Sequence, residues 1–417
     1  MAGKPLIYLD HAATTPTRPE VVEAMLPYFT DNYGNPSSVY SIAQKNKAVI
    51  TECREKIAAS LNANSNEIFF TAGGSEADNW ALKAVAEAYC DDGLDIGKDY
   101  ISDIGARKNA FGKKRGRHII TTKIEHHAIL HTCEYLEKRG FEVTYLDVDE
   151  NGVVKLDVLK NAIRPDTILI SVMYANNEIG TIQPIKEIGE IASANNIIFH
   201  TDAVQAYGQI PIDVEECHID MLSASGHKLN GPKGIGFLYI RNGVKVGSFI
   251  HGGAQERGRR AGTENVPGIV GLSKACEIAF DTMEDRMSKE IAMRDHMIDR
   301  ILAEIPYARL NGHRTKRLPN NVNISFQFVE GESMLIMLDM AGICASAGSA
   351  CTSGSIDPSH VLLAIGLPDD IAHGSIRLTL GDENTMEEID YVVEKIKENV
   401  GRLRAMSPQY DDYMKHR

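Results

Sequence analysis

Short hydrophobic runs along the first part of the chain predict β-strands. They are rich in β-branched and aromatic residues, and polar or glycine-rich turns bound them. The seven predicted strands are residues 67–72, 118–123, 142–148, 167–175, 197–202, 221–225 and 236–240. Helical patterns separate most of them, among them residues 185–194 and a run after Leu156. Strands alternating with helices predict an α/β fold with a seven-stranded, mainly parallel sheet flanked by helices.

The pattern changes from about residue 264. Helices are predicted over residues 284–305 and 331–340, and strands over 321–328 and 375–380. A last helix opens at Thr385 with a glutamate three residues later, the pattern of a capping box, and continues with apolar residues at helical spacing.

These patterns divide the chain into two domains. We predict a large domain over residues 16–263 and a smaller α+β domain made of residues 1–15 and 264–417. The polar tail after Ser407 is expected to fray. Residues 91–116, rich in glycine and charge, fit no element; a surface insertion is favoured over a partner-binding feature.

Composition narrows the class of protein. Hydrophobic residues make up 43% and charged residues 24%, as is ordinary for a soluble globular chain, and no apolar run approaches the roughly 20 residues of a membrane span. The net charge of −13 gives no support to a nucleic-acid partner. We see no secretory signal, and seven cysteines without a CxxC pair predict reduced thiols in the cytoplasm.

A glycine-rich turn follows the first long strand. Gly73 and Gly74 end the strand and Ser75 opens a helix, so free backbone N–H groups could seat a phosphate there. A tight turn with Ser75 as a simple helix cap explains the same residues. On these residues alone, the simple turn is favoured.

Two charged residues stand at the ends of other predicted strands. Asp202 ends one strand, where a carboxylate needs a partner. A protonated ring nitrogen of a cofactor would be such a partner. A role as the cap of the next helix explains the same residue equally well. Lys228 follows another strand and can bond an aldehyde, although a single lysine is usually a surface residue. Ligands gather at the carboxyl ends of parallel strands, so the coincidence favours a shared site.

Histidines follow the strand at 118–123. His126 could stack on a flat ring or move protons. His127 and His131, four residues apart with Cys133 nearby, could instead bind a metal. The absence of a fourth ligand makes the metal site the less favoured interpretation.

The segment 343–360 carries a candidate nucleophile. Alanine, serine and glycine surround Cys351 and cannot bury a core, so a mobile loop with a reactive thiol is predicted. Cys344 is expected at a buried strand position. The remaining cysteines are expected to be structural: Cys53, Cys90, Cys133, Cys217 and Cys276.

Taken together, these residues resemble the NifS/IscS-type cysteine desulfurases, a branch of the class V aminotransferases with fold type I of the pyridoxal-phosphate (PLP) enzymes. Residues 255–265 and 317–320 resemble the nitrogen-fixation type more closely than the housekeeping type. The matching motifs are YLDHAATTP (8–16), YGNPSS (33–38), YANNEIGT (174–181), TDAVQ (201–205), SGHK (225–228), HGGAQERGRRAGTENV (251–266), GSACTSGSIDPSH (348–360) and HGSIRLTLG (373–381).

The resemblance implies roles for particular residues. Lys228 would hold PLP covalently, Asp202 would pair with its ring nitrogen, and His126 would stack on the ring. Arg377 would clamp the substrate carboxylate bidentately, and Asn177, near the ring oxygen, would contact both the cofactor and the substrate. The remaining cofactor contacts would come from Gln205 at the ring oxygen, from Gly74, Ser75, Ser225 and His227 at the phosphate, and from Thr263 at the phosphate of the partner subunit in a homodimer.

It also implies a reaction. Sulfur would be transferred from L-cysteine to Cys351 as a persulfide, and alanine would be released. An iron–sulfur scaffold would then accept the sulfur. No resident metal is expected, and Cys351 would contact an iron–sulfur cluster only transiently. Two departures from the family pattern are Ser75, where threonine is frequent, and the longer segment 91–116. Three alternatives stay open: aminotransfer or selenocysteine cleavage on the same fold, a metal-binding protein, and a non-catalytic scaffold.

Overall fold

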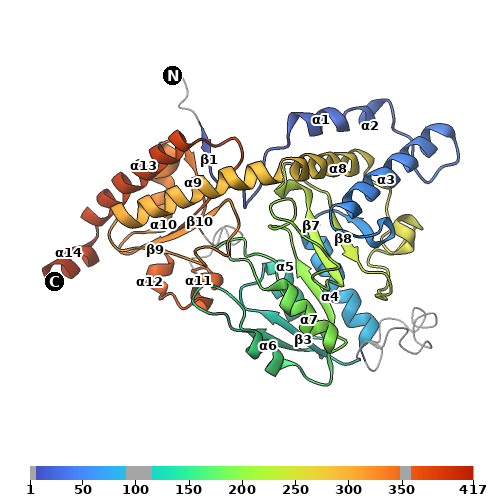
Figure 1. Cartoon of the computed structure of the whole chain (residues 1–417), viewed down its shortest axis with the longest axis horizontal. Coiled ribbons are helices and arrows are strands. Elements are labelled where there is room, and N and C mark those ends of the chain that lie inside the picture. The colour runs from blue at the N-terminus through green and yellow to red at the C-terminus, as the bar shows by residue number, and fades with distance from the viewer. Residues whose placement is uncertain (1–5, 91–114, 348–357, 417) are drawn as a thin grey trace.

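The structure is a computed structural model that describes residues 6–90, 115–347 and 358–416. Figure 1 shows two parts side by side: a larger part that carries α3, α4 and α7, and a smaller part that carries α10 and α13. Cys351 and nearly all of the segment 91–116 lie outside the described residues, so the expectations for them stay predictions.

The larger part is built on a seven-stranded sheet, as predicted. Its strand order is β2-β8-β7-β6-β5-β3-β4, and only β8 runs antiparallel to its neighbours. All seven predicted strands are confirmed, each within a few residues of the expected ends. Their bounds are β2 Ile68–Thr71, β3 His118–Thr122, β4 Glu142–Leu146, β5 Thr167–Ser171, β6 Ile198–Asp202, β7 Met221–Ser225 and β8 Gly236–Ile240.

Helices cover both faces of this sheet because its strands contribute apolar side chains to a core on each side. Phe69 packs in a core with α4 and α5, whereas its neighbour Phe70 packs in a second core with α3, α6, α7 and α8. Trp80 of α4 is fully buried against Phe69 and Phe249. The bounds are α3 Ser41–Ala59, α4 Gly74–Tyr89, α5 His127–Glu137, α6 Leu156–Ala162, α7 Ile185–Ala194 and α8 Val266–Asp281.

The smaller part is an antiparallel sheet backed by helices, in agreement with the predicted α+β pattern. Strand β10 lies between β9 and β12, and a separate core joins them to α9, α10 and α13. The N-terminal strand β1 pairs in parallel with β11, so the start of the chain belongs to this part. The bounds are β1 Ile7–Tyr8, β9 Ala308–Leu310, β10 Asn321–Phe326, β11 Ile343–Cys344, β12 Ser375–Thr379, α9 Met283–Glu304, α10 Gly331–Met340 and α13 Met386–Ala405.

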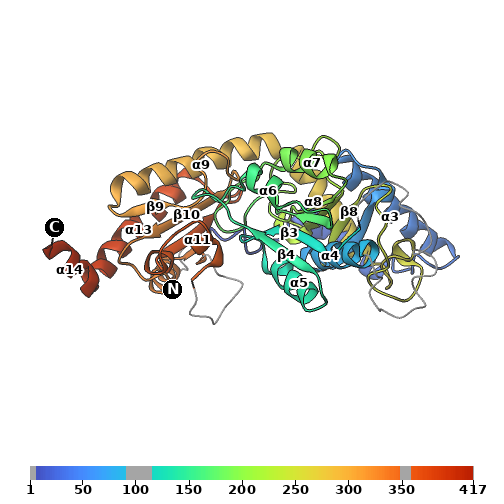
Figure 2. The same ribbon diagram turned by 90° about the horizontal axis from the view of Figure 1, so that it is seen from below.

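Short helices complete the chain. Viewed from below in Figure 2, α9 lies along one side of the molecule and α5 projects from the other. None of the helices in the described ranges is long and apolar enough to cross a membrane. The remaining helices are α1 Pro19–Met25, α2 Pro27–Thr30, α11 His360–Ala364, α12 Asp369–Ala372 and α14 Pro408–Lys415, with 3₁₀ turns at Ser65–Glu67, Gly226–Lys228 and Gln255–Gly258.

The tail after Ser407 differs from its prediction, because it forms α14 instead of fraying. The Ser407 side chain caps this helix by accepting the Tyr410 backbone N–H, and the rings of Tyr410 and Tyr413 pack against Phe328. The predicted polar character is correct, but two tyrosines at helical spacing supply an aromatic anchor.

The domain boundary at residue 264 stays a prediction. Helix α8 lies just after this boundary, yet it packs with the large sheet.

The capping box of α13 generates a stability prediction. Thr385 Oγ1 accepts the Glu388 N–H at 3.3 Å, and the Glu388 carboxylate accepts the Thr385 N–H at 3.2 Å. We expect Thr385→Ala to lower the free energy of unfolding by about 1 kcal/mol, because one N–H of the first turn loses its acceptor. Thr385→Ser, which keeps the hydroxyl, is the control. Urea unfolding followed by circular dichroism measures both; an unchanged midpoint in the alanine variant would contradict the capping role.

Candidate active site

A cavity of about 360 Å³ opens at the carboxyl edge of the large sheet. Residues that follow β2, β3, β5, β6 and β7 line it, because those parallel strands all end at this edge. The N-terminal segment and strand β12 of the smaller part complete its wall. Ten residues that the sequence predicted as site residues line it: Gly74, Ser75, His126, Asn177, Asp202, Gln205, Ser225, His227, Lys228 and Arg377.

One end of the cavity is built from the glycine turn after β2. Gly73 has φ +148°, and a Cβ at Gly74 would lie 2.5 Å from the Val204 Cγ2 atom, so both positions require glycine. Helix α4 begins at Gly74 and runs for 16 residues, and its first N–H groups have no intrahelical acceptor. The turn therefore offers backbone donors and the Ser75 hydroxyl to an anion.

Asp202 lies at the end of the central strand β6. It is 5% exposed, and its Oδ1 accepts the Val204 N–H at 2.9 Å. Burial raises the pKa of Asp202 to about 6, against the lowering effect of that hydrogen bond and of the Lys228 charge. A nearby cation is thus needed to keep this carboxylate ionised at lower pH.

Lys228 follows β7 in a 3₁₀ turn. Its ammonium donates hydrogen bonds to the carbonyls of Ala12 and, at 2.8 Å, Ala13. Gln205 also donates to the Ala12 carbonyl, at 3.0 Å. The N-terminal motif thereby holds the amine and the amide at the cavity, a contact between residues about 200 positions apart that no local pattern could indicate.

His126 occupies the N-cap of α5. Its Nδ1 accepts the Ala128 N–H at 3.1 Å, so the neutral ring carries its proton on Nε2. Burial, and after it the charge of Lys228, lowers the pKa of His126 to about 4. The ring is therefore neutral near pH 7 and can stack on a flat group.

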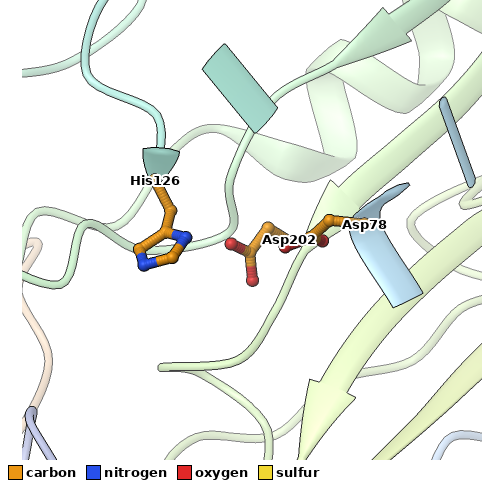
Figure 3. Close-up of side chains that lie close together, drawn as sticks. All are labelled: Asp78, His126 and Asp202. Carbon is orange, nitrogen blue, oxygen red and sulfur yellow. The ribbon is translucent and has the colours of Figure 1, made fainter. Parts of the chain in front are cut away.

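The alternative metal cluster of His127, His131 and Cys133 does not form. His131 is exposed, whereas Cys133 is fully buried, and burial raises the pKa of its thiol. In the described ranges, one group of acidic, histidine or cysteine side chains has ligand atoms close enough for a metal: Asp78, His126 and Asp202, all within 4.8 Å of one another. That group belongs to the cavity (Figure 3).

Arg377 on β12 brings the smaller part to the cavity. It is 3% exposed; Nη2 pairs with Asp10 at 3.0 Å, Nη1 donates to the Asn177 carbonyl at 3.0 Å, and Nε is buried with no hydrogen-bond partner. A buried guanidinium with an unused donor can receive an anionic ligand. Asp10 and Asn177 hold its orientation.

The described residues on either side of Cys351 are tied to the same region. Ser346 donates to Asp10 Oδ2 at 3.0 Å, so Asp10 contacts both Arg377 and this serine. Ser359 donates to the Glu178 carboxylate and caps α11. Burial raises the pKa of Glu178 to about 7, and the Ser359 hydrogen bond and the Arg377 charge oppose that rise.

The six described cysteines leave Cys351 as the candidate nucleophile. All six are free thiols, and burial raises the pKa of five of them: Cys53, Cys133, Cys217, Cys276 and Cys344. A raised pKa disfavours the thiolate and hence nucleophilic attack. Cys344 lies in β11, as expected, although it is only partly buried.

The sequence did not indicate several residues of the site. Asp78 lines the cavity and lies four residues after Gly74 on the same helix. Because positions i and i+4 share one face of a helix, this spacing could have identified Asp78 as a site residue. Asp10 and Glu178 stand in motifs that were noticed, but their contacts come from distant parts of the chain. Thr263 is exposed and does not line the cavity of its own chain.

Comparison with known proteins adds three findings. The family described as aminotransferase class V matches residues 7–97 and 104–392. The chain is 56% identical over 413 residues to the cysteine desulfurase IscS of Clostridium botulinum, covering 99% of this chain and 98% of that protein, and 57% identical over 402 residues to the namesake from Methanosarcina thermophila, covering 96% and 94%. A solved NifS-like protein, 38% identical, superimposes with a TM-score of 0.84 over 95% of this chain and 99% of that one.

The histidine geometry generates a pH prediction. We expect the His126 ring to stay neutral from pH 8 down to about pH 5, since burial and Lys228 disfavour its protonation. In contrast, His11 is expected to charge at a higher pH than free histidine, because the Glu383 carboxylate outweighs its burial and raises its pKa. Nitrogen NMR of labelled imidazoles, assigned with His126→Asn and His11→Asn, measures both. A His126 ring that titrates near pH 6.5 would contradict the prediction.

Proposed function

The chain belongs to the class V aminotransferase family, and from this we propose that it is a PLP-dependent cysteine desulfurase. The observation that carries the proposal is the convergence of Lys228, Asp202 and Arg377 on one cavity that also has an anion-binding turn. An amine, a carboxylate and a guanidinium in that arrangement match an aldehyde cofactor, its ring nitrogen and an amino-acid substrate.

The residues of the cavity fit PLP. The turn at Gly74 supplies backbone donors for a phosphate, and a Cβ at Gly74 would lie 2.5 Å from the Cγ2 atom of Val204, which lines the cavity. Asp202 supplies a partner for a cationic ring nitrogen, and the neutral His126 supplies a flat surface. When bound, PLP acts as an electron sink for bonds at the amino-acid carbon. Enzymes of this family depend on that cofactor.

Lys228 holds and releases a proton in the reaction. As a cation it rests on the carbonyls of Ala12 and Ala13, and as a neutral amine it would hold the cofactor and accept a proton from the substrate. Gln205 contacts the same Ala12 carbonyl and would touch the ring oxygen. The segment before α1 thus positions both groups.

Arg377 selects substrates with a carboxylate. Its buried Nε is unsatisfied, and Asp10 and Asn177 hold the other two nitrogens, so a carboxylate meets an oriented donor. The Asn177 side chain lines the same cavity. When the carboxylate of L-cysteine is bound at Arg377, its amino group would meet the cofactor.

Cys351 accepts the sulfur. Its thiolate attacks the sulfur of the substrate, a new S–S bond forms as the C–S bond breaks, and the electron pair of the C–S bond remains on the carbon. Protonation of that carbon completes alanine, and the persulfide on Cys351 passes its terminal sulfur to an acceptor. An iron–sulfur scaffold is the acceptor class that we infer, and the likeness of residues 255–265 and 317–320 to the nitrogen-fixation type supports a role in that assembly. The six free thiols among the described residues suit a reducing cytoplasm.

The enzyme works as a homodimer. Large apolar side chains are exposed along one continuous N-terminal segment: Val22, Leu26, Phe29, Tyr33, Val39 and Tyr40. The most exposed of them, Val39, is 92% accessible, and an accumulation of exposed apolar side chains in one segment supports an interface there. Thr263 is exposed and outside its own cavity, as a residue that reaches the partner's phosphate should be.

Two variants test the chemistry. We expect Cys351→Ser to keep the absorbance band of the lysine-bound cofactor but to lose at least 99% of alanine and sulfide release from L-cysteine, because the sulfur has no acceptor. Lys228→Ala should lose the band itself. Cys344→Ser is the matched control and should keep both.

An unchanged rate in Cys351→Ser would overturn its role as acceptor, and an unchanged band in Lys228→Ala would overturn the cofactor assignment. Alanine and sulfide must be assayed together, since their joint appearance separates desulfuration from aminotransfer.

The exposed segment generates a prediction about assembly. We expect the wild type to have twice its 45.8 kDa chain mass by light scattering. The double substitution Leu26→Glu and Phe29→Glu should shift it toward the monomer, because it places charge in an apolar contact. Ile336→Glu, at a 63% exposed position on α10, is the control and should remain dimeric. A wild type that runs as a monomer would contradict the proposed homodimer.

A further inference from the structure

Asp78 is a buried acid of the cavity to which neither the motifs nor the proposed reaction gives a role. It lies on the second turn of α4, four residues after Gly74, is 1% exposed and lines the cavity. Its Oδ1 atom is buried and has no hydrogen-bond partner. Figure 3 shows the Asp202 carboxylate between the His126 ring and Asp78, and their ligand atoms lie within 4.8 Å of one another.

Among the residues that the structure describes, no cation acts on Asp78 to hold it ionised. The nearest histidine is His200, whose Nε2 lies 3.8 Å from Asp78 Oδ1. That nitrogen contacts the Ser223 hydroxyl at 3.0 Å, and Nδ1 contacts Ser171 at 2.9 Å. Burial lowers the pKa of His200 to about 3, so this ring is neutral.

The other titratable groups that face the pair act unequally on its two members. The charge of Lys228 lowers the pKa of Asp202, whereas the Glu125 carboxyl group further raises the pKa of Asp78. Burial, and after it the charge of Asp202, raises the pKa of Asp78 well above its usual value. His126 is neutral in the same range.

Two carboxylates in contact distance inside a buried cavity cannot both be ionised at low cost. The pair therefore holds one proton. Asp202 has the Val204 N–H and faces Lys228, whereas Asp78 has an unsatisfied oxygen and the Ser223 hydroxyl. The negative charge is more stable on Asp202, so the proton belongs on Asp78.

We propose that Asp78 is a positioning residue for Asp202: a protonated carboxylic acid that shares its buried pocket and leaves the single negative charge of the pair on Asp202. The consequence is a ring-nitrogen site with a charge of −1 instead of −2, which accepts one cationic N–H and does not collect a metal ion. The link to the cofactor rests on the proposed role of Asp202, whereas the location of the proton does not.

The first test uses the apoprotein. A buried acid with a raised pKa binds its proton more tightly in the folded protein than in the unfolded chain. The protein therefore loses stability as the pH rises from about 4, the pKa in the unfolded chain, toward the pKa in the folded protein. Asp78→Asn keeps the shape and removes that loss. We expect the thermal midpoint of Asp78→Asn, relative to wild type, to rise by about 2–4 °C between pH 5 and pH 8. A constant difference between the two proteins would overturn the proposal.

The second test measures PLP binding by absorbance. If Asp78 is neutral, Asp78→Asn should bind PLP within twofold of wild type at pH 7.5, whereas Asp202→Asn should bind at least tenfold more weakly. A tenfold loss in Asp78→Asn would mean that Asp78 is a second anion and would overturn the proposal. A normal affinity in Asp202→Asn with the expected stability result would instead overturn the proposed role of Asp202 alone.

A third measurement needs no variant and covers the case in which Asp78→Asn does not fold. Apoprotein labelled with ¹³C at the aspartate carboxyl carbons should show, at pH 7.5, an isotope-shifted infrared band of a protonated carboxylic acid. The isotope shift marks aspartates and so distinguishes them from buried glutamates such as Glu125. Absence of this band would overturn the proposal. Addition of Zn²⁺ alone should leave the band in place; its loss would show that the pair binds a metal.

Discussion

Charges buried at the carboxyl edge of the large sheet must find partners inside the cavity, because water is excluded from them and an unpaired charge is costly there. Lys228 rests on two carbonyls, Arg377 on Asp10 and a carbonyl, and Asp202 on a backbone N–H. Of these three groups, Arg377 keeps a buried Nε atom without a hydrogen-bond partner. In the proposed function a substrate carboxylate would meet this guanidinium, so recognition would complete an electrostatic contact that the fold leaves open.

Arg377 extends this constraint to the relation between the two parts of the molecule. It belongs to β12 in the smaller part and pairs there with Asp10, whereas the Asn177 carbonyl that it contacts belongs to the larger part. The proposed substrate clamp would therefore depend on both parts. Asp10 also accepts from Ser346, which precedes Cys351 by five residues in the sequence. In the proposed function a substrate carboxylate at Arg377 would therefore act on a guanidinium whose partner, Asp10, also binds the Ser346 hydroxyl.

The fold was predictable from local patterns, and the site only in part. Strands such as 221–225 and helices such as 185–194 have strong periodicity, and their observed bounds agree with the prediction. Ten site residues were found because each follows a strand or stands in a recognised motif. Asp10, Glu178 and Asp78 were missed because their roles depend on contacts across the fold, and α14 was missed because its anchor, Phe328, is about 80 residues away.

The identity of residue 78 illustrates how one position can meet two requirements. An apolar side chain would remove the carboxyl partner of the Ser223 hydroxyl, which would keep only its contact with the His200 ring, and the loss of a buried hydrogen bond is costly. An ionised acid would add a second charge beside Asp202 and raise the proton affinity of both. A protonated acid avoids both costs, because it remains polar toward the serine and neutral toward Asp202. The location of a single proton thus determines which of two adjacent carboxyl groups can serve as the partner of a ring nitrogen.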